Sequence, residues 1–345
     1  MIFWYLLILA AALMNVQMCK KGFWEDYIEK DQSNAIKGLF ILLVFMRHIL
    51  QRIKRSGFVF DRQIDLDAYL LQDNIGQLVV VMFLFYSGYG VMKSLLIKGE
   101  DYLSSYPRKR LLTTLLNFDV AVCFFIILGF ITKRPMSLST VLLSFIGWDT
   151  VGNSNWYIFV ILFCYLVFYL VFRAVQSRHA FGALVVTLIV FLGMIALHSV
   201  KPAHWYNTML VFPAGIYFAL CYNSLERIIQ KYYWLFLAIL LAVFLLLHFG
   251  HFRPLHGLTF NLKSIVFALL LVVLTMKVRI RNKWLIWCGT SLFPIYIYQR
   301  LPLILIWKSA GDTWLCANPN LYIAICFVLT LGLTLIYNKY LRIII

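Results

Sequence analysis

Charged residues are scarce in this chain, and acidic residues are the scarcest of them. Only 13% of the 345 residues are charged, whereas soluble domains have about 25%. Hydrophobic residues make up 63%, which is more than a buried core can hold beneath a polar surface. These proportions exclude an ordinary soluble domain. They predict a polytopic membrane protein that folds as one all-α helix bundle.

Metal-binding and disulfide motifs are also lacking. The seven cysteines form no CxxC pair, and most of them lie in apolar segments. This pattern favours small buried residues over a disulfide framework or a zinc site. The histidines between 248 and 256 have HxxH and HxxxxH spacings, which do not fit a metal site on one helix. We therefore expect no bound metal.

The net charge of +17 raises the question of a nucleic-acid partner. Nucleic acid needs a continuous basic surface with interleaved aromatic residues. The cations of this chain are instead distributed between apolar segments, as membrane topology requires. We expect membrane lipid, and no nucleic acid, among its partners.

Apolar segments that approach the bilayer length of about 20 residues recur along the chain. They predict about eleven helices, at 2–18, 36–50, 75–97, 111–131, 155–172, 181–198, 207–222, 233–249, 259–276, 285–307 and 320–338. Lys and Arg concentrate in alternate connections, beginning with Lys20 and Lys21. The positive-inside rule then places the N-terminus outside the cell membrane and the C-terminus in the cytoplasm. A basic cluster at 52–55 lies on the other side and disagrees with this assignment.

The first segment, "MIFWYLLILAAALMNVQM", has two interpretations. A signal peptide would need a basic start and a small-x-small cleavage site, and the segment has neither. An uncleaved first helix is therefore favoured. We divide the chain into an additional N-terminal helix with a cytoplasmic linker at 1–30 and a membrane domain at 31–345.

Ionisable residues at membrane depth are costly and are usually functional. Lys37 and His48 are eleven residues apart, which on one helix is about 16 Å and close to three turns. Both side chains would then line a single channel. The alternative is that His48 only ends a helix among interfacial cations. Asp119, alone in "LLNFDVAVCFF", either orients the imidazole or forms a structural ion pair.

Four further segments carry polar groups whose role the pattern leaves open. "LFYSGYG" (84–90) is typical of close helix packing or of a kink. "YPRKR" (106–110) is either a site for an anionic cofactor or a topology signal. Trp156 opens an apolar helix as an interfacial anchor. "SLFPIYIYQRLPL" (291–303) predicts a broken helix whose freed carbonyl groups face a cavity.

"NAIKGLFILLVFMRH" resembles the first conserved helix of the acyltransferase-3 family of integral membrane O-acyltransferases. In that family an Arg-Gly pair begins the helix and a histidine follows the arginine by eleven residues. Five further stretches are similar to the family's segments and occur in its order up to residue 303: "FLFYSGYGVMKSL", "YPRKRLLTTL", "NWYIFVILFCYLVF", "FPAGIYFA" and "SLFPIYIYQ". The chain departs from the pattern at Lys37, which replaces arginine, at Thr113, which replaces the second arginine of a basic motif, and at Gln299, which replaces a common histidine.

The resemblance implies a ten-helix acyltransferase core, to which the N-terminal helix is added. It implies transfer of a short acyl group, most simply acetyl from acetyl-CoA, to a hydroxyl of a surface-glycan or lipid-linked sugar. His48 is the expected general base, since an imidazole, with its unperturbed pKa of about 6.5, suits that task. The other expected site residues are Asp119 as an orienting group, Lys37, Arg108, Lys109 and Arg110 for CoA, and Ser87, Gly88, Trp156 and Gln299 along the substrate path.

Two functions from other classes remain as alternatives. A glycolipid transporter or flippase also needs cations inside the membrane, but transporters commonly contain internal repeats, and no repeat is evident here. A non-enzymatic scaffold in glycan assembly would keep the bundle and would not need His48.

Overall fold

The computed structural model describes residues 1–250 and 256–344. This part of the chain is a bundle of α-helices with one two-stranded sheet, so the predicted all-α class is confirmed. Seven helices are long and apolar enough to cross a membrane, or eight if one bent pair counts as a span. The chain is therefore a multi-pass membrane protein. His251, from the histidine-rich segment, lies outside the described residues.

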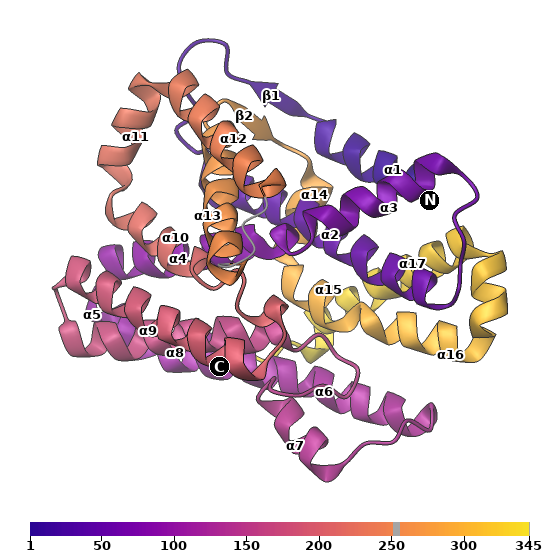
Figure 1. Ribbon diagram of the computed structural model, residues 1–345. Helices are drawn as coiled ribbons and strands as arrows, with labels where there is room; N and C mark the ends of the chain where they lie inside the picture. Colours follow the sequence, from indigo (N-terminus) through magenta and orange to yellow (C-terminus); the bar gives the residue numbers. More distant parts are fainter. Residues whose placement is uncertain (251–255, 345) are drawn as a thin grey trace.

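The elements follow one another along the chain with short connections (Figure 1). They are α1 (Ile2–Leu13), β1 (Val16–Met18), α2 (Lys30–Arg55), α3 (Gln63–Ile75), α4 (Leu78–Lys98), α5 (Glu100–Tyr106), the π-helix η1 (Pro107–Leu112), α6 (Thr113–Ile131), α7 (Leu138–Phe145), α8 (Trp156–Val175), α9 (His179–Val200), the 3₁₀-helix η2 (Ala203–Trp205), α10 (Val211–Leu220), α11 (Tyr222–Lys231), α12 (Tyr233–Phe249), α13 (His256–Thr275), β2 (Val278–Ile280), α14 (Lys283–Thr290), α15 (Leu292–Tyr298), α16 (Arg300–Ala317), α17 (Pro319–Ile336) and the π-helix η4 (Tyr337–Leu341).

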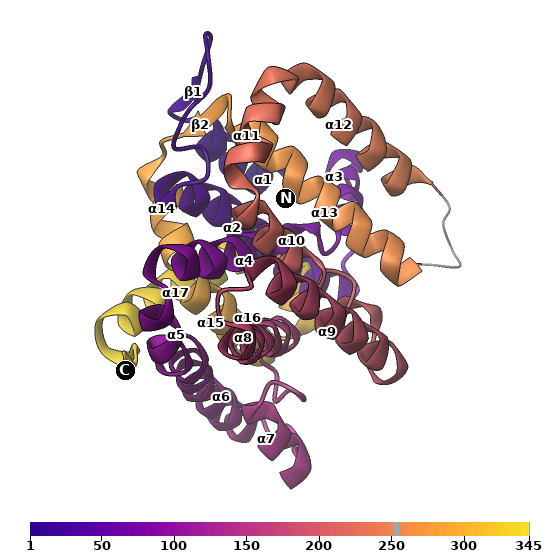
Figure 2. The same cartoon turned by 90° about the vertical axis from the view of Figure 1, so that its left-hand side faces the viewer.

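Helices α2 and α4 form the centre of the bundle. Figures 1 and 2 show them between α12 and α13 on one side and α6 and α8 on the other. Helix α14 packs along α2, and α10 packs along α4. Most residues of α2 and α4 are buried, whereas α12 buries only Tyr233 and presents apolar side chains outward. A rim of apolar helices around a buried pair is the arrangement expected for a bundle surrounded by lipid.

Glycines allow helices α2 and α14 to approach each other closely. A Cβ added at Gly38 of α2 would lie 1.9 Å from the carbonyl oxygen of Leu285, and one added at Gly289 of α14 would lie 1.8 Å from that of Asn34. Backbone therefore meets backbone on both sides of this contact, and no rotamer change can make room for a side chain. Small residues at such positions are typical of helix pairs in membranes.

We expect Gly38→Ala to lower the free energy of unfolding by about 1–3 kcal/mol, the usual cost of forcing extra atoms into a packed interface. Gly332→Ala is the matched control, because a Cβ at that helical position meets nothing within 4 Å. The melting temperature in detergent should fall for Gly38→Ala and stay level or rise slightly for Gly332→Ala. Equal melting temperatures for the two variants would contradict the proposed contact.

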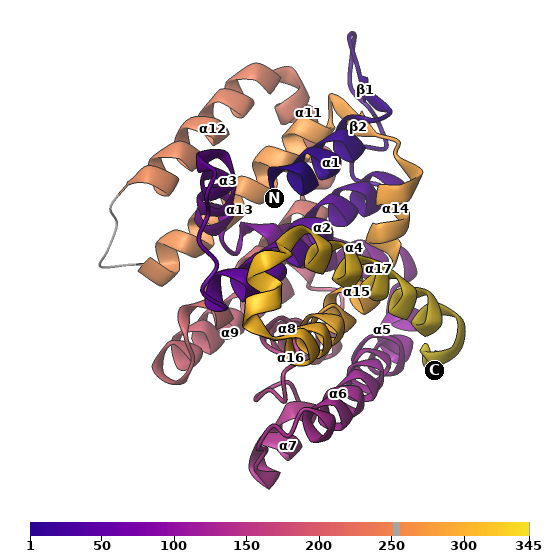
Figure 3. The ribbon, with the colours of Figure 1, turned by 90° about the vertical axis from the view of Figure 1, so that its right-hand side faces the viewer.

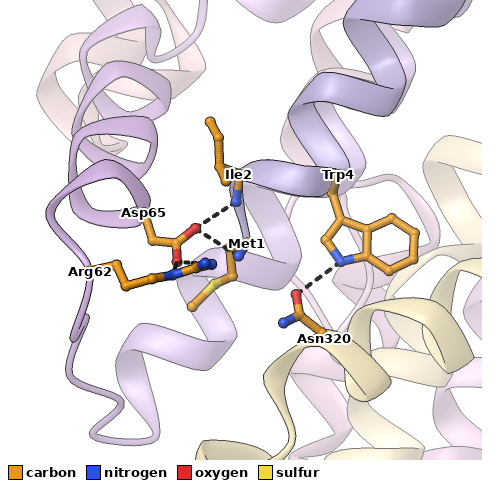
Figure 4. A network of polar contacts seen from close by, with 6 residues as sticks. All are labelled: Met1, Ile2, Trp4, Arg62, Asp65 and Asn320. Carbon is orange, nitrogen blue, oxygen red and sulfur yellow. Dashed lines mark hydrogen bonds and ion pairs between the residues drawn. The ribbon is translucent and has the colours of Figure 1, made fainter.

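The N-terminal segment differs from the helix expected at 2–18. Helix α1 ends at Leu13, and Val16–Met18 pairs antiparallel with β2, with Val16 opposite Ile280. A network of polar contacts holds the start of α1 (Figure 4). Asp65 of α3 accepts from the backbone N–H of Ile2 at 2.6 Å and lies 2.7 Å from the Met1 amine. The first helix is therefore a short element fixed to the bundle.

The helix expected at 285–307 is broken, as its proline and polar residues predict. It is divided into α14, α15 and α16, with breaks at Ser291 and Gln299. Figure 3 shows α15 and α16 beside α17, on the side of the bundle that is at the right in Figure 1. The second break places Gln299 and Arg300 at the start of α16, where both point toward α2 residues described below.

Candidate active site

One cavity of about 680 Å³ lies between α2, α4, η1, α8 and the α14–α15 break. We call it the Lys37 cavity. Its walls carry no carboxylate among the described residues, and five cations line it: Lys30, Lys37, Lys93, Lys98 and Arg110. Lys30 and Lys37 are seven residues apart, so they share one face of α2. Such a concentration of positive charge is suited to a ligand with several negative charges.

The "YPRKR" segment reaches this cavity through one residue only. Residues 107–112 form the π-helix η1, a wider turn that often occurs at functional sites. All three basic side chains are exposed to solvent, but Arg110 also lines the Lys37 cavity, while Arg108 and Lys109 line neither cavity. Ser87 of α4 lines the cavity opposite Lys37 on α2. The structure thus separates four predicted CoA contacts into two cavity residues and two surface residues.

A second cavity, of about 340 Å³, contains His48. We call it the His48 cavity. One face of α2 forms much of its wall, because the residues recur every three or four positions along the helix. These residues are Val44, Arg47, His48, Gln51, Arg52 and Arg55. The remaining wall comes from the start of α4, Trp156, His204, Tyr296 and the start of α16.

The His48 ring has free hydrogen-bonding capacity. Its Nδ1 atom is buried and has no hydrogen-bond partner among the described residues. Gln299 lies beside the ring and is fully buried. The Gln299 amide donates to the carbonyl oxygen of Tyr296 at 3.1 Å, and its own carbonyl oxygen has no partner in the described part. Buried polar atoms are rarely left unpaired. The His48 Nδ1 atom and the Gln299 carbonyl oxygen therefore mark a place where a ligand binds or where the two side chains bond to each other.

Aromatic side chains form the opposite wall of the His48 cavity. The Trp156 ring meets the His204 ring edge-on at 5.8 Å. The carbonyl oxygen of His204 accepts from Gln77 at 2.6 Å, which fixes the loop before α10 to the start of α4. Burial lowers the pKa of His204 below its ordinary value, so this imidazole is neutral at pH 7. Neutral His204 adds no further positive charge to the cavity.

An aromatic partition separates the two cavities. Within residues 1–250 and 256–344, no residue lines both of them. Tyr157 faces the Lys37 cavity and Tyr296 faces the His48 cavity, and their rings pack edge-to-face at 5.4 Å. The single channel expected from the Lys37–His48 spacing is therefore divided in this structure. Both residues do lie on α2, but in different chambers.

Two predicted site residues lie away from both cavities. A Cβ at Gly88 would be 2.0 Å from the carbonyl oxygen of Phe212, so Gly88 serves the close contact between α4 and α10. Asp119 lies on α6 and has a buried Oδ1 without a partner among the described residues. It does not line the His48 cavity. The structure therefore gives no support to Asp119 as the group that orients His48.

Sequence reasoning did not include the arginines of the His48 cavity. Arg47, Arg52, Arg55 and Arg300 all line it. Two signals were available. Arg52 and Arg55 follow His48 at four and seven residues, the spacing of one helix face. They also belong to the cluster that disagrees with the positive-inside rule.

A comparison with protein-family models finds a match over residues 31–339 to a model described as an acyltransferase domain, that of the acyltransferase-3 family. The match includes every residue of the two cavities except Lys30. No curated protein and no solved structure matches the chain.

Proposed function

Because this chain belongs to the acyltransferase-3 family and is a membrane acyltransferase, we propose that it transfers a short acyl group, acetyl from acetyl-CoA, to the hydroxyl of a surface-glycan or lipid-linked sugar. The observation that carries this proposal is the position of His48. Its ring lies in the wall of a polar cavity, one aromatic layer away from a strongly basic cavity on the same helix. A base and a site for an anionic donor are thus held on one rigid element.

The chemistry needs a proton acceptor beside the acceptor hydroxyl. In the proposed reaction His48 takes the hydroxyl proton while the oxygen attacks the thioester carbonyl carbon. The C–S bond then breaks, and the CoA thiolate leaves and takes up the proton that His48 has accepted. A nearby arginine is suited to stabilise the negative charge that develops on the carbonyl oxygen. Arg300, in the wall of the same cavity, is the residue we propose for this role.

The donor and acceptor are proposed to enter from opposite ends of α2. The phosphates of CoA would bind the cations of the Lys37 cavity, and the sugar would bind in the His48 cavity against Trp156, whose flat ring suits the apolar face of a sugar. The pantetheine arm would carry the acyl group past Ser87 toward Tyr157 and Tyr296. These two rings must move apart for the reaction to occur. Rotation of aromatic side chains that opens a path is a common gating step in enzymes.

We further propose that the Lys37 cavity opens to the cytoplasm and the His48 cavity to the outside of the cell membrane, with the N-terminus outside and the C-terminus inside. Lys21 and Lys54 are both exposed, and Lys21 precedes the first residue of α2 whereas Lys54 lies in the last turn of that helix. In a variant without the native cysteines, a membrane-impermeant maleimide applied to intact cells should label Lys54→Cys and not Lys21→Cys. The reverse labelling pattern would overturn this orientation.

Mass spectrometry of surface glycans tests the function itself. Deletion of the gene should remove an acetyl group from one glycan component, and expression of the intact chain should restore it. A variant with His48 replaced should not restore it. If glycan acetylation is unchanged by deletion while glycan export is lost, the transporter alternative is favoured.

A further inference from the structure

The His48 cavity has an unusual balance of charge. Arginines at positions 47, 52, 55 and 300 line it, and no Asp or Glu does among the described residues. Like charges gathered around one cavity repel one another unless an anion between them compensates the charge. The donor does not explain this charge, because the Lys37 cavity has five cations of its own. The compensating group for the His48 cavity must therefore be found elsewhere.

Protein contacts account for only part of this charge. Arg47 lies 3.6 Å from Asp73 and donates to the carbonyl oxygen of Gln72 at 2.9 Å. Arg300 donates to the carbonyl oxygen of Asn153 at 3.2 Å, and Arg52 lies 3.9 Å from the centre of the Trp307 ring. No carboxylate in the described part of the chain lies within 4 Å of Arg52, Arg55 or Arg300. Three guanidinium groups, of which that of Arg55 is also exposed to solvent, thus line one small cavity with no carboxylate beside them among the described residues.

We propose that the acceptor is an anionic sugar, one that carries a carboxylate or a phosphate close to the hydroxyl that is acylated. This inference rests on the proposed function and specifies its acceptor. The planar guanidinium fork matches both oxyanions in a two-point contact. Arg52 and Arg55 follow His48 by four and seven residues, which is about 6 Å and about 10 Å along the helix. An oxyanion held by these side chains lies in the same cavity as the base.

The test uses three probes that differ only at C6 of the sugar. Methyl glucoside is neutral, methyl glucuronide carries a carboxylate, and methyl glucoside 6-phosphate carries a phosphate. With purified full-length protein and acetyl-CoA, we expect kcat/KM for at least one charged probe to exceed that for the neutral probe by about 10-fold or more. The preferred charged probe identifies which oxyanion the site takes.

Arg55→Gln tests the residues. It should raise the KM of the preferred charged probe by about 10- to 100-fold, change the neutral probe little, and leave CoA affinity unchanged. Arg55→Lys should retain part of the affinity, because it keeps the charge and loses the fork. Lys54→Gln is the matched control, since Lys54 is the adjacent cation, is exposed like Arg55, and lines neither cavity.

Direct binding, measured by calorimetry without acetyl-CoA, separates this inference from the proposed function. Absence of transfer to every probe, together with tighter binding of a charged probe that Arg55→Gln abolishes, would reject the function and keep the anionic site. Equal binding of all three probes, or weaker CoA binding in Arg55→Gln, would overturn the inference.

Discussion

Replacing His48 with alanine is expected to reduce acyl transfer by about 100- to 10,000-fold, the range that positioned general bases contribute. The expectation follows from the position of the His48 ring, which lies in the wall of the His48 cavity. The Nδ1 atom of this ring has no hydrogen-bond partner in the described part of the chain. The sugar hydroxyl is a weak nucleophile at neutral pH. Removal of the base therefore slows the attack itself and should lower kcat more than it changes the KM for either substrate.

His179→Ala is the matched control for this experiment. His179 begins α9 and lines neither cavity, so its loss should leave transfer near the native rate. Expression, melting temperature and CoA binding should be the same for both variants. The readout is thiol release from acetyl-CoA in the presence of an acceptor. A His48→Ala protein that transfers acetyl at more than one tenth of the native rate would contradict the role of this ring.

The sequence predicted the architecture well where hydrophobic runs were long and uninterrupted. The segment 233–249 was predicted with the same bounds as α12, and 320–338 corresponds closely to α17. It failed where tertiary contacts decide the structure. Residues 16–18 are apolar enough to continue a helix, yet they pair with residues 278–280, more than 250 positions away in the chain. Local hydropathy carries no information about such a partner.

The site was predictable along α2 and much less so across the bundle. Lys37 and His48 could be placed on one face from their spacing, because one continuous helix, Lys30–Arg55, contains both. The partition between the two cavities could not be predicted. It depends on Tyr157 of α8 meeting Tyr296 of α15, two residues that are far apart in the chain. The glycine at position 88 likewise could not be assigned from the sequence, because a small residue within a helix is expected both for close helix packing and for a substrate path.

The basic cluster at 52–55 shows how a departure from a general rule becomes informative. The positive-inside rule describes charges that set topology, and it gives no reason for Arg52 and Arg55 at the far end of α2. Both line the His48 cavity. Lys54, between them, lines neither cavity. Under the proposed orientation, cations on the unfavoured side of a membrane helix become candidates for function when their spacing places them on the face of a candidate catalytic residue.

The second large expected effect concerns donor binding. Lys37→Ala and Arg110→Ala should each weaken the binding of CoA to the purified protein by about 10- to 100-fold, since each removes one charged hydrogen bond to a phosphate. The two residues approach the Lys37 cavity from α2 and from η1, so they contact the anion from different directions. Their effects should be close to additive unless they share one phosphate. CoA affinity should also fall as salt concentration rises.

The neighbours of Arg110 make this prediction specific. Lys109 and Arg108 carry the same charge within two residues of Arg110, yet neither of them lines either cavity. If general attraction of the basic loop for an anion were sufficient, Lys109→Ala would weaken CoA binding as much as Arg110→Ala does. If the cavity binds the phosphates, calorimetry should show a large loss only for Arg110→Ala and Lys37→Ala, with near-native affinity for Lys109→Ala. Equal losses for all three variants would remove the donor from the Lys37 cavity and leave its five cations without a ligand.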